Sequence, residues 1–343
     1  MAITTKKSTN EDKLLDVKDL KISFKTDEGI VTAVDGINFS VKRGQTLGIV
    51  GESGSGKSVS TWSIMRLLPK NSIIDEGSSI QFHRKSGKIV EMTKLKANSR
   101  ELRKIRGGEV ALIFQEPMSS FSPVYTIGNQ IMEAVLQHRD VSKEEAQEIA
   151  IDMLDRVGIS NPRQRFEQYP FELSGGMRQR AMIAVALSMN PSLLIADEPT
   201  TSLDVTIQAQ ILELMNELKE ELGMAIIFIT HNLGVIAQVA DEIEVMYLGK
   251  ILERGTTKEI IHQPQHPYTQ ALLKAIPRLD RIGERLTAIS GDIPSPLSRP
   301  MGCPFYTRCE KVMPGICDLK MPSPTKLSDT HTVYCFLHEE KDV

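Results

Sequence analysis

Hydrophobic and polar residues alternate along two segments near the start of the chain. These segments cover residues 14–24 and 33–42, and the pairs Glu28-Gly29 and Asp35-Gly36 interrupt the pattern. A period of two residues is typical of strands that bury one face, and pairs of an acidic residue and glycine favour turns. The pattern therefore predicts antiparallel strands in this region.

Unbroken apolar runs replace this alternation further along the chain. They occupy residues 46–51, 192–197 and 225–231. Short runs of this kind are typical of parallel strands that are buried on both faces. Helical patterns fill the chain from about residue 117 to residue 190, and residues 208–223 predict an amphipathic helix that ends at Gly223.

The order of these elements predicts the fold class and its limits. Residues 242–255 predict a hairpin that turns at Leu248-Gly249, and prolines become frequent beyond Gly255. Strands that alternate with helices predict an α/β domain around a mainly parallel sheet. We expect a disordered tail over residues 1–13, the α/β domain over 14–258, and a C-terminal extension over 259–343.

Composition narrows the class of protein. Hydrophobic residues make up 41% and charged residues 25% of the 343 residues, which is the mix of a soluble globular protein. The net charge of −3 gives no sign of nucleic-acid binding. The start of the chain has no apolar core of a signal peptide, and no apolar run is long enough to span a bilayer. Work at a membrane would therefore require docking onto another chain that spans it.

A glycine-rich loop follows the first apolar run. Its sequence from Gly51 to Ser58 fits the pattern G-x-x-x-x-G-K-[ST] between a predicted strand and a helix. In such a loop, successive backbone N–H groups point at phosphate oxygens. We expect ATP to be bound here by the following residues: Gly51, Ser53, Gly54, Ser55, Gly56, Lys57, Ser58 and Val59. Lys57 would reach the β- and γ-phosphates, and Ser58 would bind Mg²⁺.

Two acidic residues end the second apolar run. The predicted strand places Asp197 at the metal, and Glu198 is positioned to polarise the attacking water as a general base. The phosphate loop and this acidic pair together predict an enzyme that hydrolyses ATP.

Several further motifs, in order along the chain, make it resemble the ABC ATPases. Leu173-Ser174-Gly175-Gly176-Met177 resembles the signature motif, Gln115 the Q-loop glutamine, Ser202-Leu203-Asp204 the D-loop, and His231 the switch histidine; Phe24 is placed like the aromatic residue that stacks on adenine. The resemblance implies a P-loop NTPase core with an antiparallel β subdomain and a helical subdomain over about residues 117–190. It also implies that Gln115, with Ser58 and Asp197, binds Mg²⁺, and that His231 contacts the γ-phosphate.

This resemblance further implies a dimer. In the family, two ATPase domains pack head to tail, so that Ser174, Gly175 and Gly176 of one subunit close over the ATP of the other and Asp204 lies at the interface. Because the chain carries one copy of each motif, it needs a second ABC ATPase subunit, and we expect a heterodimer. The resemblance also implies two membrane-spanning permease subunits as partners, which place the chain at the cytoplasmic face of the cell membrane. An extracellular substrate-binding protein is an indirect partner.

Two segments indicate a branch of the family. The segment from Gln115 through Pro123 to Gln130, and His266-Pro267-Tyr268-Thr269, resemble the oligopeptide and dipeptide importers. Glu116 and Ser122 stand where many members have aspartate and asparagine. The same branch includes importers of nickel and glutathione, which stay open as alternatives. A soluble ABC ATPase is a further alternative, although the chain has neither two ATPase domains nor a long coiled coil.

All four cysteines lie in the last part of the chain, at Cys303, Cys309, Cys317 and Cys335. This set resembles the cysteines of the peptide-importer extension, where family members can carry a [4Fe-4S] cluster. Four thiolates suit either such a cluster or structural zinc, and their spacing does not choose between them. We expect a [4Fe-4S] cluster with a structural or regulatory role, with zinc or free thiols as alternatives.

Overall fold

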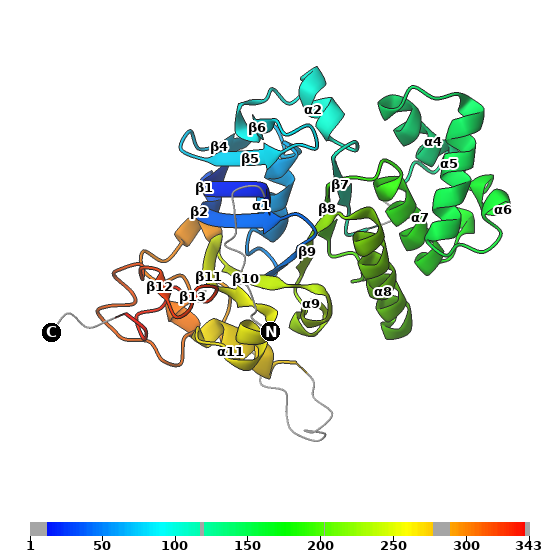
Figure 1. Cartoon of the computed structure of the whole chain (residues 1–343). Helices are drawn as coiled ribbons and strands as arrows, with labels where there is room; N and C mark the ends of the chain where they lie inside the picture. Colours follow the sequence, from blue (N-terminus) through cyan, green and yellow to red (C-terminus); the bar gives the residue numbers. More distant parts are fainter. Residues whose placement is uncertain (1–11, 117–119, 202, 277–288, 340–343) are drawn as a thin grey trace, which may run out of the picture.

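A computed structural model of the chain describes residues 12–116, 120–201, 203–276 and 289–339 (Figure 1). Residues 1–11 of the expected tail, residues 117–119 after the predicted Q-loop, and Ser202 of the predicted D-loop lie outside the described residues.

The first sheet is antiparallel and holds the strands expected from the alternating pattern. Strands β1 (Lys13–Thr26) and β2 (Gly29–Lys42) pair along their whole length. Three short strands complete this sheet: β4 (Ser72–Ile74), β5 (Ser79–His83) and β6 (Ile89–Glu91). Its order is β2-β1-β5-β6, with β4 also on β1. The short strands were not predicted because three to five residues carry too little periodicity.

The second sheet has the order β12-β13-β11-β10-β3-β9-β8-β7. Its central strands are parallel: β7 (Val110–Ile113), β8 (Leu193–Asp197), β9 (Ala225–Thr230), β3 (Thr46–Val50) and β10 (Glu242–Tyr247). The unbroken apolar runs predicted β3, β8 and β9, whereas β7 was not predicted. Strand β11 (Lys250–Thr256) pairs antiparallel with β10, which confirms the predicted hairpin.

The two faces of this sheet belong to different hydrophobic cores. Along β8, Leu193 and Ile195 pack into the core shared with the antiparallel sheet, whereas Leu194 and Ala196 pack into the core on the opposite face. Because successive side chains of a strand point to opposite faces, a strand covered on both sides must be apolar throughout. This requirement explains the unbroken apolar runs in the sequence.

The helices follow in chain order and surround the sheets (Figure 1). Their bounds are α1 Lys57–Ile64, α2 Arg100–Ile105, α4 Ile127–His138, α5 Lys143–Arg156, α6 Pro162–Phe166, α7 Gly175–Leu187, α8 Val205–Leu222, α9 Leu233–Val239, α10 Thr257–His262 and α11 Pro267–Lys274. Helices α4 to α7 form the group beyond β7 and β8 in Figure 1. Helix α8 ends at Gly223, whose φ of 62° is the left-handed conformation that glycine adopts easily.

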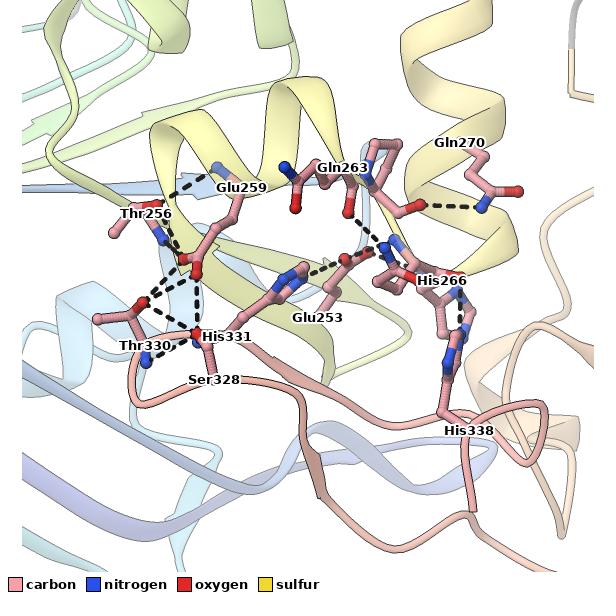
Figure 2. Close-up of polar contacts among 12 residues, drawn as sticks. Glu253, Thr256, Glu259, Gln263, His266, Gln270, Ser328, Thr330, His331 and His338 are labelled. Atoms are coloured by element: carbon pink, nitrogen blue, oxygen red, sulfur yellow. Dashed lines mark hydrogen bonds and ion pairs between the residues drawn. The ribbon is translucent and has the colours of Figure 1, made fainter. Parts of the chain in front are cut away.

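The C-terminal segment adds two short strands to the edge of the main sheet. Strand β13 (Thr332–Val333) pairs with β11, and β12 (Thr325–Lys326) pairs with β13. Figure 2 shows the polar contacts that attach this segment: the buried carboxylate of Glu253 on β11 accepts hydrogen bonds from Nε2 of His331 at 2.7 Å and from the backbone N–H groups of Gln265 and His266. The extension is therefore continuous with the α/β sheet.

Candidate nucleotide site

The predicted phosphate loop connects β3 to α1. A Cβ atom on Gly51 would lie 2.1 Å from the carbonyl oxygen of Met246, and one on Gly56 (φ 97°) would lie 2.6 Å from that of Ala33. Only glycine fits at these two positions, because the loop passes so close to neighbouring backbone. Ser53 and Gly54 are exposed at the tip of the loop, whereas Ser55 is buried.

Lys57 lies over the loop that it belongs to. Its Nζ donates hydrogen bonds to the carbonyl oxygens of Gly51, at 2.8 Å, and Glu52, at 2.9 Å. Burial lowers the pKa of Lys57, and the negative charges of Glu198 and Asp197 oppose this shift. The lysine is thus held inside the loop, where an incoming phosphate can take the place of these carbonyl oxygens as its partner.

Asp197, at the end of β8, lies next to the start of α1. Its Oδ1 accepts a hydrogen bond from Oγ of Ser58 at 3.0 Å, and its Oδ2 accepts one from Nε1 of Trp62 at 3.0 Å. Burial raises the pKa of Asp197. A hydroxyl and a carboxylate side by side are oxygen ligands of the kind that Mg²⁺ takes. Sequence reasoning did not find Trp62, because an indole has no place in the motif.

Glu198 gathers three side chains from different parts of the chain. Its Oε1 lies 3.2 Å from Nδ1 of His231, and its Oε2 accepts hydrogen bonds from Nε2 of Gln115 at 3.1 Å and Oγ1 of Thr201 at 2.9 Å. Glu198 has a φ of 46°, which is uncommon for a residue with a side chain and is often found at functional sites. Thr201 had not been identified in the sequence.

Phe24 lies on β1, in register with Val31 of β2 and Ser72 of β4. Its ring is partly buried against the core of the antiparallel sheet. The loop itself reaches this sheet, because Gly56 lies against Ala33 and Val34 of β2. Stacking of Phe24 on adenine remains a prediction.

The predicted signature motif begins helix α7. Oγ of Ser174 accepts a hydrogen bond from the backbone N–H of Met177 and caps the helix, and Ser174 and Gly175 are exposed. Asp204 caps α8 in the same way by accepting hydrogen bonds from two backbone N–H groups. Ser174, Gly176, Leu203 and Asp204 line one cavity of about 410 Å³. The structure thus brings the predicted signature and D-loop residues together.

The His-Pro-Tyr segment forms the start of helix α11. Nδ1 of His266 accepts a hydrogen bond from the backbone N–H of Tyr268, and Pro267 occupies the first turn, where its missing N–H is not needed. The hydroxyl of the buried Tyr268 accepts a hydrogen bond from the backbone N–H of Glu52 in the phosphate loop, at 2.9 Å. Glu52 was passed over in the sequence as a variable position of the motif.

The four cysteines lie in the C-terminal segment as free thiols, three of them buried and Cys309 partly buried. Burial raises the pKa of Cys303 to about 12 and that of Cys335 to about 11, and the neighbouring cysteines add to both shifts. Across residues 12–116, 120–201, 203–276 and 289–339, no three or more His, Cys, Asp or Glu side chains form a group that could hold a metal ion.

None of the helices in the described residues is long and apolar enough to cross a membrane.

Two known protein families together match most of the chain. Residues 34–201 match the ABC transporter family, and residues 252–317 match the family described as "Oligopeptide/dipeptide transporter, C-terminal region".

Individual relatives match over nearly the whole length. The chain is 49% identical over 330 residues to the dipeptide transport ATP-binding protein DppD of Bacillus subtilis, covering 96% of each chain. It is 49% identical over 311 residues to the oligopeptide transport ATP-binding protein OppD of Escherichia coli, covering 91% of this chain and 89% of that protein.

A solved structure with a similar fold is the ATP-binding cassette MJ0796, described as a dimer in a post-hydrolysis state bound to ADP and Pi. It has a TM-score of 0.62 and 26% sequence identity, over 71% of this chain and 99% of that chain.

Proposed function

The chain belongs to the ABC transporter family, and from this membership we propose how its residues carry out ATP-powered peptide import. Its relatives are ATP-binding proteins of dipeptide and oligopeptide transport, and the match extends through the C-terminal region specific to that branch. The chain is the ATPase subunit that drives a peptide importer. The observation that carries the mechanism is the convergence of Gln115, Thr201 and His231 on Glu198, beside Lys57 and Asp197.

The phosphate loop binds the nucleotide, and Glu198 acts on water. The N–H groups of the loop and the start of α1 receive the phosphates, and Lys57 moves from its two carbonyl partners to phosphate oxygens. Ser58 and Asp197, together with Gln115, would hold Mg²⁺, which neutralises phosphate charge when bound. Glu198 takes the proton of the attacking water, and His231 and Gln115 hold the carboxylate in position.

A second ATPase subunit completes the site. Ser174 and Gly175 are exposed at the start of the 13-residue helix α7, where backbone N–H groups and the helix dipole favour a phosphate. Each subunit thus supplies a phosphate loop and, to its partner, a signature motif. The dimeric state described for MJ0796 supports this arrangement. We expect the second subunit to be a related chain.

The membrane partners that we propose are permease subunits, since the relatives are ATP-binding proteins of peptide transport. The chain is expected to be peripheral at the membrane. We place it at the cytoplasmic face, with an extracellular binding protein delivering peptide on the other side.

The test is purification of the transporter from native membranes. We expect the chain to copurify with integral membrane subunits and a second ATPase chain, and to hydrolyse ATP faster when the binding protein presents peptide. Isolation of the active ATPase without any membrane subunit would contradict the proposal.

We propose that the four cysteines hold a [4Fe-4S] cluster, with structural zinc as the alternative. The described residues hold no group of side chains that could bind a metal ion as they stand, and this applies to zinc and to a cluster alike. Burial raises the pKa of Cys303 and of Cys309, and hydrogen bonds from the backbone N–H groups of Phe305 and Lys311 oppose this shift. When bound, the cluster would link distant parts of the extension. Chain purified without oxygen should contain iron and absorb visible light; a colourless, iron-free chain would exclude the cluster.

A further inference from the structure

A side chain of the C-terminal extension reaches the phosphate loop directly. The guanidinium of Arg308, in the 3₁₀ turn Tyr306–Arg308, forms a two-point ion pair with the carboxylate of Glu52. Its Nη1 lies 2.7 Å from Oε2, and its Nη2 lies 3.1 Å from Oε1. The Arg308 side chain is only 4% exposed, and that of Glu52 is 24% exposed. Two parallel hydrogen bonds fix the orientation of both groups as well as their separation.

The rest of the guanidinium is fully engaged, so that Arg308 has one position. Its Nε donates to the carbonyl oxygen of Ser290 at 3.1 Å, and its Nη1 also donates to the hydroxyl of Tyr247 at 3.3 Å. The guanidinium carbon lies 5.8 Å from the centre of the Tyr247 ring. An arginine held this firmly can hold its partner firmly in turn.

The backbone of Glu52 is held from the same side. Its N–H donates to the hydroxyl of Tyr268, and its carbonyl oxygen accepts from Lys57. The rings of Tyr268, Tyr247 and Phe305 lie within 4.8 to 5.4 Å of one another, centre to centre, and fix the tyrosine hydroxyl. Two residues of the extension therefore hold the side chain and the N–H of one loop residue.

We propose that Arg308 and Tyr268 are positioning residues of the phosphate loop, which set the affinity for nucleotide through Glu52. The proposal rests on the assignment of this loop as the ATP site. The extension is thereby a structural part of the nucleotide site.

The charge of Glu52 gives the ion pair a specific task. A carboxylate beside a loop that must receive phosphate opposes nucleotide binding unless its charge is balanced. Glu52 is near enough to Lys57 to be among the charges that act on the lysine. Arg308 balances the charge of Glu52 and also turns its carboxylate toward the extension.

Attachment of the extension does not by itself require this ion pair. Glu253 and His331 already join the extension to β11, and Arg299 pairs with Asp35 of β2. A buried ion pair commonly gives little net stability over apolar residues of similar size. Attachment and stability therefore do not account for the ion pair, whereas positioning of the phosphate loop does.

Arg308 also precedes Cys309 and lies between Cys303 and Cys309 in the chain. One peptide bond separates Arg308 from Cys309. The phosphate loop and the cysteine segment are consequently joined through a short stretch of chain.

The test measures binding of MgADP to the full chain by titration calorimetry, together with kcat and KM for ATP in the assembled transporter. Arg308→Met leaves the carboxylate of Glu52 unbalanced, and we expect affinity for MgADP to fall roughly fivefold to tenfold, with a matching rise in KM and little change in kcat. The double variant Glu52→Gln/Arg308→Met removes the unbalanced charge as well, and should bind more tightly than Arg308→Met alone. Tyr268→Phe should weaken binding roughly threefold.

The control is Arg163→Met. Arg163 forms a two-point pair with Glu148 at 3.0 and 2.8 Å, but on the exposed surface of α6 and α5. This variant should bind like the wild type. If Arg308→Met does not fold, Arg308→Lys is the variant that tests the inference. It keeps the positive charge but loses the second hydrogen bond to Glu52, so it should weaken binding of MgADP by a smaller factor than expected for Arg308→Met.

Wild-type affinity in the folded Arg308 variant, or a double variant weaker than Arg308→Met, would overturn the inference. Failure of the wild-type chain to bind MgADP would instead refute the assignment of the ATP site, so that the two failures are distinguishable.

Discussion

At the scale of single residues, Glu198 is the point at which the polar contacts of the candidate site meet. Its carboxylate contacts His231 after β9, Gln115 after β7 and Thr201 three residues further along the chain. Its backbone adopts a positive φ. Such a conformation costs about 1–3 kcal/mol and persists only where surrounding contacts impose it. One of these contacts is the hydrogen bond that the backbone N–H of Glu198 donates to the carbonyl oxygen of Ile229, at 3.0 Å.

Replacement of Glu198 by glutamine should separate binding from hydrolysis. The amide keeps the shape of the side chain but cannot accept the proton of the attacking water. We expect turnover to fall by a factor of about 100 or more, while ATP stays bound and holds the dimer closed. Single-turnover hydrolysis and gel filtration with MgATP measure the two effects. Rapid hydrolysis by Glu198→Gln would show that another group is the base.

At the scale of elements, helix α11 shows how a short motif serves several purposes. Its first residues cap the helix through His266, start it through Pro267 and reach the phosphate loop through Tyr268. Burial lowers the pKa of His266 to about 3, with the nearby His338 adding to the shift. The neutral imidazole is the form that accepts the hydrogen bond from Tyr268.

This lowered pKa predicts a pH dependence of stability. Between its ordinary value of 6.5 and about 3, His266 is protonated in the unfolded chain but not in the folded one. The unfolded state therefore binds more protons, and this residue's contribution to stability falls as the pH is lowered through that window. His266→Asn, which keeps a capping oxygen, should show a flatter fall of melting temperature between pH 7 and pH 4. An unchanged slope would mean that other groups dominate.

At the scale of the whole molecule, the extension is joined to the sheet through buried polar groups. Glu253 is fully buried and accepts hydrogen bonds from His331, Gln265 and His266, which come from both ends of the extension (Figure 2). Glu259 adds a second group of contacts with Thr330 and Ser328 near the start of α10. One carboxylate on β11 thus organises contacts over 78 residues of sequence.

Replacement of Glu253 by leucine should detach the extension. It leaves a buried imidazole and two backbone N–H groups without their acceptor, at a cost of about 3–5 kcal/mol. We expect a lower melting temperature and faster tryptic cleavage of the extension.

The matched control is Glu244→Gln. Burial raises the pKa of Glu244 to about 8, so the protonated form of this glutamate predominates at pH 7, and the substitution should change stability by about 1 kcal/mol or less. Equal effects of Glu253→Leu and Glu244→Gln would contradict the role given to Glu253.

Local patterns in the sequence predicted three of the parallel strands, the long helices and the residues of the candidate nucleotide site. Periodicity reports burial of a face. The motifs place Asp197 and Glu198 at the end of one strand and Lys57 after the loop that follows another, and ligands bind at this edge of an α/β sheet. Resemblance to the ABC ATPases and the peptide branch was confirmed by the family matches.

Only the tertiary structure decided which distant residues meet. Trp62 at Asp197 and the two-residue strand β13 on β11 carry no periodic signal. Arg308 and Glu52 are separated by 256 positions in the chain, and neither has a pattern that names the other. Such contacts arise when whole elements pack together, so that the bond between the extension and the phosphate loop is a property of the fold.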